Sequence, residues 1–388
     1  MGLRGCSGCP GYVSHMGQSI AVMNTKGGVG KSTVVMSLAE TLSAYHGKNV
    51  LVIDSDSQTS MSHMLMHSTS WEHMERQHRT LVDYLMNRVL GPADMSWKDV
   101  IASGVSDVED ARSVYLIPSH MELSLFEREV SGQKRENELR ATVRTLLDET
   151  TRMFDIVLVD CPPGLSLLTE CWLREVQYFI PPTKPDYLAV RGLAILKKFR
   201  EEFAQPSFAE LLGVLINLKD GRIASEEEWH AKLAADPANR CFKTHIPRRA
   251  YIQRAADFDM GKRTYIAKYP GDAGQSIRAV TQEVIARLAG KPVEASVPKA
   301  PALPAPAAAP VAAGAPVPSA SAPVQGPPGA RPAIASTFAK ESAAVMPQMR
   351  VATPVRPGPP PSPAIKPDSA PINIEPPRPA ISQAKLAK

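Results

Sequence analysis

A short run near the N-terminus, MNTKGGVGKSTVV (23–35), combines glycines, two lysines and adjacent hydroxyls at close spacing. Its glycines let backbone N–H groups turn toward an anion, and a helix starting just after them would point its positive end at the same place. In such a loop Lys31 reaches the β- and γ-phosphates of a nucleotide, and the Ser32 hydroxyl binds Mg²⁺. Lys26 has no part in this chemistry and needs a separate explanation.

Acidic residues follow two apolar runs, VLVIDSDSQ (50–58) and FDIVLVDCPPG (154–164). A carboxylate at the carboxyl end of a buried strand is well placed to hold Mg²⁺, usually through water. Asp160 fits this role most naturally, and Asp54 is a second candidate. Asp56 lies two residues beyond Asp54 on the same face of an extended chain and could orient an attacking water. The alternative is that either acid near residue 55 merely caps the next turn.

The elements around these residues alternate between strand and helix. Unbroken apolar runs typical of strands buried on both faces occur at 19–24, 49–55, 114–118, 154–160, 176–180 and 211–217. Helix-period segments separate or follow them at 32–46, 121–150, 192–204 and 273–289. This order predicts an α/β fold, a doubly wound and mostly parallel sheet flanked by helices, with ligands at the carboxyl ends of the strands.

Composition divides the 388-residue chain into three regions, a variable extension (1–17), the α/β domain (18–291) and a tail (292–388). The tail begins with Pro, Ala and Ser, and 24 of the 36 prolines follow residue 290. Such a composition cannot bury enough apolar surface to offset its ordering entropy, so we expect a disordered arm. The tail also carries ten basic and four acidic residues. Since the net charge of the whole chain is +5, residues 1–290 have a net charge of about −1.

Five sparse cysteines without a secretory signal favour a reducing cytoplasm. Cys6 and Cys9 form a C-x-x-C pair with no second pair at zinc-like spacing, which gives little support for a metal or redox role. They lie in a stretch, 1–15, that precedes the first convincing strand. No apolar run in the sequence reaches the length that a membrane-spanning helix needs.

The motifs KGGVGKST, DSDSQ and DCPPG, in this order, resemble those of the deviant-Walker ATPases of the ParA/MinD family, and of its ParA branch most closely. The resemblance continues through 116–129, 180–193, 213–217 and 246–255, and spans roughly residues 18–290. It departs from the family at Ser57, where proline is common in D-x-D-P-Q. That difference leaves both acids in place.

The resemblance implies ATP and Mg²⁺ as ligands and a homodimer when ATP is bound, with Lys26 reaching the phosphates of the partner's nucleotide. It also implies that Asp56 activates water, that Asp160 lies beside Mg²⁺, and that Asn217 and Pro247 lie near adenine. The expected catalytic residues are Lys26, Lys31 and Asp56, and the expected metal-site residues are Ser32, Asp54 and Asp160. The expected nucleotide contacts are Lys26, Gly27, Gly28, Val29, Gly30, Lys31, Ser32, Thr33, Asn217 and Pro247.

Clustered cations late in the domain predict a surface for DNA. Arg and Lys side chains that neutralise phosphates give sequence-independent, salt-sensitive binding, although such clusters are often only solvated faces. The candidate DNA-binding residues are Arg222, Arg248, Arg249, Arg254, Lys262 and Arg263, with Lys268 in the same cluster.

These expectations point first to an ATPase that partitions plasmid or chromosomal DNA and is stimulated by a ParB-like partner. The same engine positioning a protein cargo through an adaptor, such as a chemosensory array or microcompartment, is the alternative. A MinD-like membrane role is less favoured, because the final residues, PRPAISQAKLAK, are too short and too proline-bounded for a membrane helix. We therefore expect a cytoplasmic, nucleoid-associated protein with no membrane partner.

Overall fold

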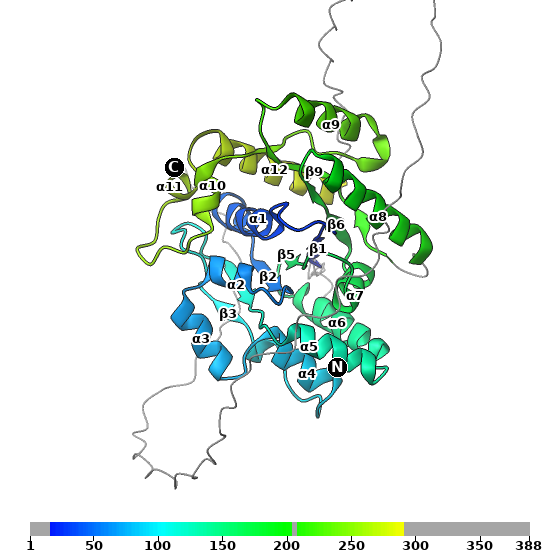
Figure 1. Ribbon diagram of the computed structural model, residues 1–388. Helices are drawn as coiled ribbons and strands as arrows, with labels where there is room; N and C mark the ends of the chain where they lie inside the picture. The colour runs from blue at the N-terminus through cyan, green and yellow to red at the C-terminus, as the bar shows by residue number, and fades with distance from the viewer. Residues whose placement is uncertain (1–15, 204–207, 291–388) are drawn as a thin grey trace, which may run out of the picture. The chain divides into compact units, whose positions relative to one another are not determined.

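The computed structural model describes residues 16–203 and 208–290, in which helices cover both faces of a mostly parallel sheet (Figure 1). The larger sheet has the strand order β3-β4-β2-β5-β1-β6-β8, and only the β3–β4 pair is antiparallel. Its strands are β1 (Gln18–Val22), β2 (Val50–Asp54), β3 (Ala102–Ser103), β4 (Val114–Ile117), β5 (Ile156–Asp160), β6 (Tyr178–Ile180) and β8 (Glu210–Leu211). The predicted fold class is therefore confirmed.

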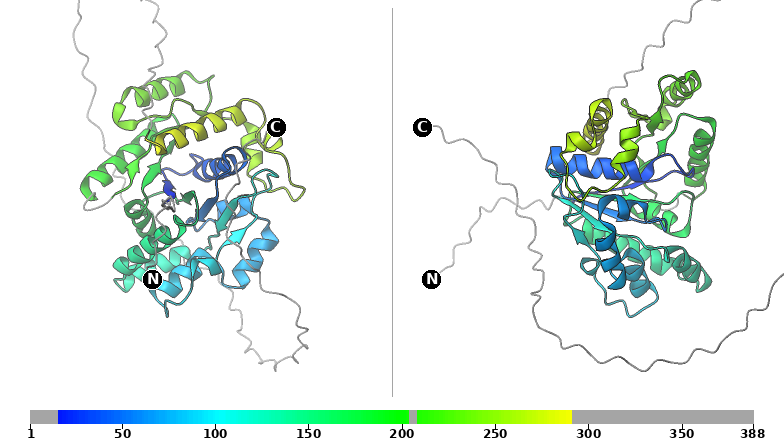
Figure 2. Two further views of the ribbon diagram at one scale, coloured as in Figure 1. Left: turned by 180° about the vertical axis from the view of Figure 1, so that it is seen from behind. Right: turned by 60° about the vertical axis from the view of Figure 1, so that its left-hand side comes forward.

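Two apolar layers hold this sheet because successive strand residues point to opposite faces. In β2, Val50 and Val52 pack on one side while Leu51 and Ile53 pack on the other. The first side holds α1 (Lys31–His46), α2 (Ser60–Leu65), α3 (Ser68–Arg76), α10 (Ala250–Ala255), α11 (Tyr265–Lys268) and α12 (Gly271–Leu288). The second side holds α4 (Leu81–Val89), η1 (Trp97–Asp99), α5 (Leu123–Gly132), α6 (Glu136–Thr150) and α7 (Leu167–Glu175). Figure 2 shows α12 lying beside α1, which it contacts.

A second, three-stranded sheet, in the order β10-β9-β7, continues from the first. Its strands are β7 (Pro182–Thr183), β9 (Leu215–Lys219) and β10 (Ile246–Pro247). Near it lie α8 (Tyr187–Phe203), α9 (Ala224–Ala235) and η2 (Pro237–Asn239). The predicted strand at 211–217 is thus two strands in different sheets. They part at Gly213, where an added Cβ would lie 2.4 Å from the Arg240 carbonyl oxygen.

The predicted helix at 121–150 is also divided. It forms α5 and α6, and between them Lys134 adopts a left-handed backbone conformation with φ of 57°. A left-handed residue cannot continue a right-handed helix, so the chain turns there. A helical period that runs through both segments does not reveal this break.

The strand register brings the two acidic motifs together. Asp54 at the end of β2 pairs with Asp160 at the end of β5, and Val22 of β1 pairs with Asp160 from the other side. The phosphate-loop segment follows β1 directly, so all three motifs meet at one edge of the sheet.

The Cys6–Cys9 pair and the proline-rich tail lie outside the described residues, so the predictions about them stand as predictions. None of the helices that the structure describes combines the length and hydrophobicity needed to span a bilayer.

Candidate nucleotide site

The segment between β1 and α1 forms a glycine-rich loop that ends at the first residue of a 16-residue helix. Gly28 and Gly30 have φ of 71° and 82°, a conformation that other residues rarely adopt. At Gly30 an added Cβ would also lie 2.5 Å from the Asn217 amide nitrogen. That amide donates to the Val29 carbonyl at 2.8 Å, so a side chain of β9 supports the loop.

An open pocket of about 320 Å³ lies over this loop. The loop, the segment after β2 and the segment after β5 all contribute to its wall. Its lining residues are Gly27, Gly28, Gly30, Lys31, Ser32, Thr33, Asp56, Gln58, Ser60, Met64 and Pro163. The pocket therefore unites the predicted phosphate loop with the acid predicted to orient water. Sequence reasoning missed Gln58, Ser60, Met64 and Pro163 as lining residues. Gln58 and Ser60 closely follow Asp56, and Pro163 belongs to the DCPPG motif, so these three could have been suggested.

Lys31 supplies the positive charge within this pocket. Its side chain is buried, and burial lowers its pKa, while the nearby carboxylates of Asp160 and Asp56 act in the opposite direction. An ammonium group held among carboxylates at a helix N-terminus is suited to bind phosphate oxygens.

Asp160 is fully buried, and neither of its carboxylate oxygens has a hydrogen-bond partner among the described residues. Burial raises its pKa well above the usual range, the neighbouring Asp54 carboxyl adds to this, and the Ser32 hydroxyl and Lys31 oppose it. A buried, unpaired carboxylate facing a hydroxyl is the arrangement expected at a hard-cation site. The donor set of Asp160 and Ser32 therefore fits a nucleotide-bound Mg²⁺ and its waters.

The structure shows that Asp54 also has a structural role. One of its oxygens accepts hydrogen bonds from the Ser62 N–H at 2.8 Å and the Ser62 hydroxyl at 2.6 Å, and the other accepts from the Asp56 N–H at 3.1 Å. Burial raises its pKa to about 7 in spite of these donors. Asp54 therefore fixes the loop before α2, and its contact to Mg²⁺ stays a prediction. Ser62 was not identified from the sequence.

Asp56 lies at the pocket with 8% of its surface exposed. Its Oδ1 accepts from the Gln58 N–H at 3.0 Å, and its carboxylate is close enough to Lys31 to influence that lysine's pKa. This location is compatible with the predicted contact to an attacking water.

Lys26 does not line the pocket of its own chain. Its ammonium group bonds to both oxygens of Asp186, just before α8, at 2.9 and 2.8 Å. Both side chains are a little over a quarter exposed, at 28% and 29%. Asp186 was not singled out from the sequence. The pairing shows that Lys26 is held at the surface beside the loop.

Two residues were predicted to lie near adenine. Asn217 is buried, and its amide nitrogen donates to the Val29 carbonyl, so in this structure it supports the phosphate loop. Pro247 is buried in β10, next to β9. A contact between either residue and a base stays a prediction.

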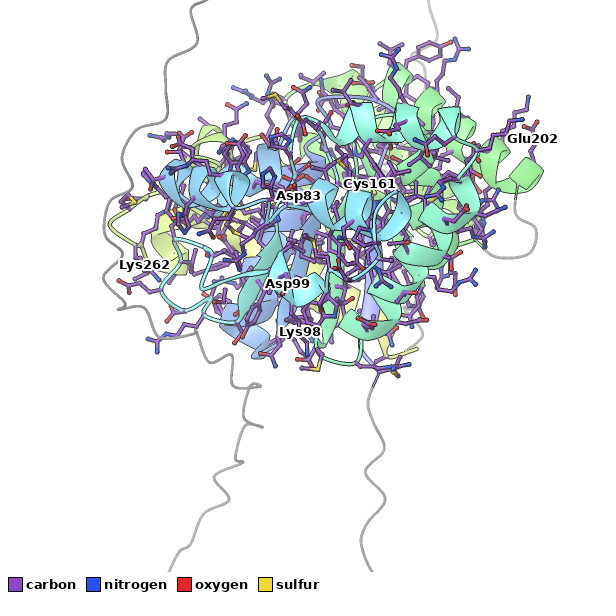
Figure 3. All side chains as sticks on the ribbon, turned by 90° about the horizontal axis from the view of Figure 1, so that it is seen from below. Asp83, Lys98, Asp99, Cys161, Glu202 and Lys262 are labelled. Carbon is purple, nitrogen blue, oxygen red and sulfur yellow. The ribbon has the colours of Figure 1, made fainter. Side chains whose placement is uncertain are left out.

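The predicted DNA-binding cations fall into three groups. Arg248, Arg254 and Lys262 are exposed and form no side-chain ion pair with a described residue, and Figure 3 shows Lys262 at the periphery. Arg222 pairs with Asp220, and Arg249 pairs with Asp272, while both stay accessible.

Two cations of that cluster are structural. The Arg263 guanidinium bonds to the buried Asp107 carboxylate at 2.7 Å and to two backbone carbonyls. Lys268 is buried between Glu40 and Asp107, at 2.7 and 2.6 Å. We therefore leave Arg263 and Lys268 out of the candidate surface. A sequence pattern cannot distinguish them from their exposed neighbours, because their carboxylate partners are far away along the chain.

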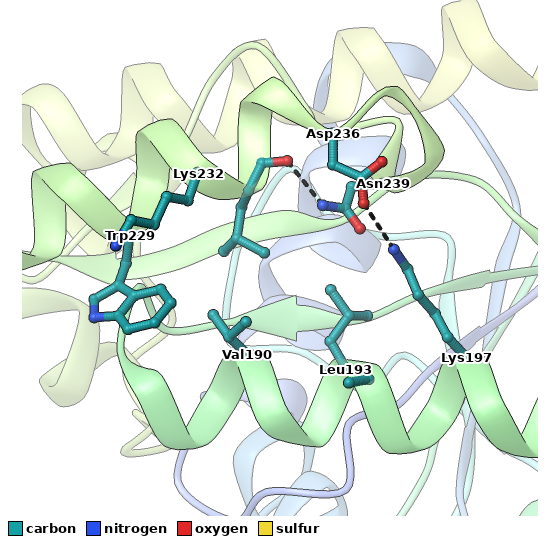
Figure 4. Close-up of a pocket in the computed structure, with 9 residues that line it drawn as sticks. Val190, Leu193, Lys197, Trp229, Lys232, Asp236 and Asn239 are labelled. Carbon is teal, nitrogen blue, oxygen red and sulfur yellow. Dashed lines mark hydrogen bonds and ion pairs between the residues drawn. The ribbon is translucent and has the colours of Figure 1, made fainter.

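A second pocket, of about 180 Å³, lies between α8 and the α9–η2 segment (Figure 4). Val190, Leu193 and Trp229 form apolar walls, and Lys197 pairs with Asp236 at 3.0 Å across one end. It shares no lining residue with the phosphate pocket.

Comparisons with known proteins agree with this geometry. An AAA domain family model matches residues 17–211. The chromosome-partitioning ATPase Soj of Thermus thermophilus is 30% identical over 272 residues, which cover 69% of this chain and 96% of that protein. The chromosome partitioning protein ParA of Caulobacter vibrioides is 28% identical over 69% of this chain and 94% of its own. Among solved structures, an ATP complex of McdA from Cyanothece is similar in fold, with 18% identity and a TM-score of 0.55, over 71% of this chain and 97% of that one.

The phosphate loop, the buried acids and the parallel sheet define a P-loop nucleotide-binding protein. Together with these relatives, they show that the chain belongs to the ParA/MinD family of P-loop ATPases.

Proposed function

We propose that this chain is a Mg²⁺-dependent ATPase that dimerises on ATP, binds DNA without sequence preference and partitions plasmid or chromosomal DNA. The observation that carries the proposal is the different placement of the two lysines of the loop. Lys31 serves the pocket of its own chain, whereas Lys26 stands outside that pocket at the surface. A surface cation beside the loop is suited to a second copy's triphosphate.

In the proposed cycle, Lys31 and the loop N–H groups bind the phosphates, while Asp160 and Ser32 hold Mg²⁺, which stabilises the negative charge of the transferred phosphoryl group. Asp56 orients the attacking water. When ATP joins two copies, Lys26 leaves Asp186 for the partner's phosphates. Loss of the γ-phosphate removes the charge that holds the pair together, so hydrolysis ends the dimeric state.

The exposed cations Arg248, Arg254 and Lys262 supply the DNA contact, with Arg222 and Arg249 beside them. A ParB-like partner stimulates hydrolysis and releases the protein from DNA. This scheme makes the protein cytoplasmic and nucleoid-associated, with no membrane partner.

The test is binding of the full chain to a labelled non-specific DNA duplex, with ATP, with ADP and without nucleotide. We expect binding with ATP alone, and a fall in affinity of about tenfold or more between 50 and 200 mM salt if several phosphates are contacted. Lys31→Ala should abolish both nucleotide and DNA binding.

A pair of charge-reversal substitutions distinguishes DNA binding by the basic surface from ATP binding at the phosphate loop. Arg248→Glu with Arg254→Glu should weaken DNA binding and leave ATP binding intact, whereas the exposed control pair Lys98→Glu with Arg128→Glu should change neither. DNA binding that does not depend on the nucleotide, or that is unchanged in the Arg248→Glu with Arg254→Glu variant, would remove DNA from the proposal. An ATP-dependent dimer with no DNA affinity would favour the alternative, positioning of a protein cargo by the same engine through an adaptor.

A further inference from the structure

A buried tryptophan outside the pocket is bonded to the loop that carries Asp56. Trp172 lies on α7, has no exposed surface, and donates its indole N–H to the Ser55 hydroxyl at 2.7 Å. Buried indole N–H groups need a partner, and this one is found 117 residues away along the chain. The bond reaches the one residue that separates Asp54 from Asp56.

Ser55 is also held through its backbone. Its N–H donates to the Asp160 carbonyl at 3.0 Å, and only 1% of its surface is exposed. The residue between the two acids is therefore tied to the end of β5 by its main chain and to α7 by its side chain. Asp54 is fixed in addition by Ser62.

Beyond Ser55 the chain itself supplies less restraint. The Thr59 N–H bonds to the Asp56 carbonyl at 2.9 Å, which closes a four-residue turn with Ser57 in its second position. Proline at that position would fix the backbone φ, and serine does not. The Ser57 N–H makes no hydrogen bond to any residue that the structure describes. The turn then enters α2 through Thr59, in the left-handed conformation at φ of 55°.

We propose that Trp172 is a positioning residue for ATP hydrolysis, acting through the Ser55 hydroxyl to hold the Asp56 carboxylate in place. The inference rests on the proposed ATPase function. It adds a restraint from α7, which packs on the face of the sheet opposite α1 and α2. A water-orienting group must be held within a fraction of an ångström, so a tether one residue away affects turnover more than nucleotide binding.

The first test is ATP hydrolysis by the full chain at saturating Mg·ATP, alongside the dissociation constant for ATP. Trp172→Phe keeps an apolar ring and removes only the donor. We expect kcat to fall about three- to tenfold, as for loss of one neutral hydrogen bond, with the dissociation constant changed less than about twofold. Adding Ser55→Ala to Trp172→Phe should lower kcat no further, because both changes remove the same bond.

The matched control is Trp97→Phe, a change at another buried tryptophan, in η1. It should leave kcat unchanged even if stability falls. Ser57→Pro added to Trp172→Phe should restore much of the lost turnover by fixing the turn locally. Failure of that rescue would count against loop immobilisation as the cause, and an unchanged kcat in Trp172→Phe would overturn the inference.

Hydrogen exchange of residues 55–60 provides a readout that needs no hydrolysis. Exchange there should be faster in Trp172→Phe than in the unmutated chain or in Trp97→Phe. If the unmutated chain binds Mg·ATP but does not hydrolyse it, the proposed function fails by itself, and the exchange comparison still decides whether Trp172 holds the loop. Equal exchange in all three proteins would overturn the tether.

Discussion

Asp160 ends a central strand with both carboxylate oxygens buried and unpaired among the described residues, close to Asp54 and Lys31. Without nucleotide and Mg²⁺, this site holds acids at a high pKa. An acid whose folded-state pKa is raised favours folding while it is protonated. That contribution is lost as the pH rises from the unfolded-state pKa to the folded-state pKa, and the loss is complete above the folded-state value.

We therefore predict that the nucleotide-free protein loses stability as the pH rises from about 4 to about 7, between the usual pKa of an aspartate and the raised pKa of about 7 at Asp54. Asp160→Asn should lose less over the same range, because the amide does not titrate. Each fully titrating acid contributes about 1.4 kcal/mol per pH unit. Urea unfolding at pH 5, 6 and 7 measures this.

The comparison with Asp160→Asn matters more than the raw slope. His230 and His245 have lowered pKa values because they are partly buried near Lys219, and their titration acts in the opposite direction. Equal pH dependence in the two proteins would show that Asp160 is ionised in the nucleotide-free state.

The second prediction at this scale concerns Asp56. Asp56→Ala should bind Mg·ATP normally and lower turnover by about a hundredfold or more, the usual contribution of a group that activates water. Single-turnover hydrolysis measures the effect, with Glu138→Ala on the exposed face of α6 as control. Hydrolysis at the unmutated rate would remove Asp56 from the mechanism.

The residues of the loop could be predicted because they are contiguous and their chemistry depends on the backbone. By contrast, the sequence could not predict that Asp54 and Asp160 have different environments. Both acids end buried strands, and what distinguishes them is Ser62, eight residues beyond Asp54, which satisfies one carboxylate and leaves the other free.

At the scale of elements, α8 lies directly against the phosphate loop. A Cβ added at Gly192 would lie 2.6 Å from the Thr25 hydroxyl and 3.1 Å from the Asn24 side-chain oxygen. Glycine to alanine within a helix usually stabilises by about 1 kcal/mol, but here the new methyl group would displace the start of the loop.

We predict that Gly192→Ala weakens ATP binding severalfold, as measured by titration with a fluorescent nucleotide. Gly132→Ala is the control, because Gly132 ends α5 and a methyl group added there would have no atom within 4 Å. The control should be neutral or slightly stabilising. Unchanged nucleotide affinity in Gly192→Ala would show that the loop absorbs the methyl group.

A buried charge network joins α1 to the segment around α11. Lys268 donates to Glu40 and Asp107, Tyr269 donates to Glu40 at 2.6 Å, and Arg263 completes the cluster. All of these groups except Arg263 are fully or almost fully buried. The network thus connects the helix of the phosphate loop to the part of the chain that bears the candidate DNA surface.

Removing the central cation leaves two buried carboxylates with too few partners. Lys268→Met should therefore lower the free energy of unfolding by about 3–5 kcal/mol, whereas Lys262→Met on the surface should change it by about 0.5 kcal/mol or less. Denaturant unfolding compares the two. Similar stabilities would contradict a structural role for Lys268.

Element order was predictable because buried parallel strands are short apolar runs, and β1, β2, β4, β5 and β6 lie where the runs do. The divided strand at 211–217 and the divided helix at 121–150 were not. The strand is divided around Gly213, which Arg240 approaches closely, and the helix is divided at a left-handed Lys134. Neither feature changes the apolar pattern.

At the scale of the whole molecule, the account depends on a second copy of the chain. Lys26 has a carboxylate partner of its own in one chain and lies beside its own loop without lining the pocket. A triphosphate from a partner would compete with Asp186 for this ammonium group. ATP would then act as the link between two chains.

The most direct measurement of this claim is the mass of the hydrolysis-blocked Asp56→Ala protein in solution at micromolar concentration with Mg·ATP. The account predicts twice the 42.0 kDa of the single chain with ATP, the single mass with ADP, and the single mass with ATP when Lys26→Ala is added. An ATP-loaded Asp56→Ala protein that stays at 42.0 kDa would contradict it.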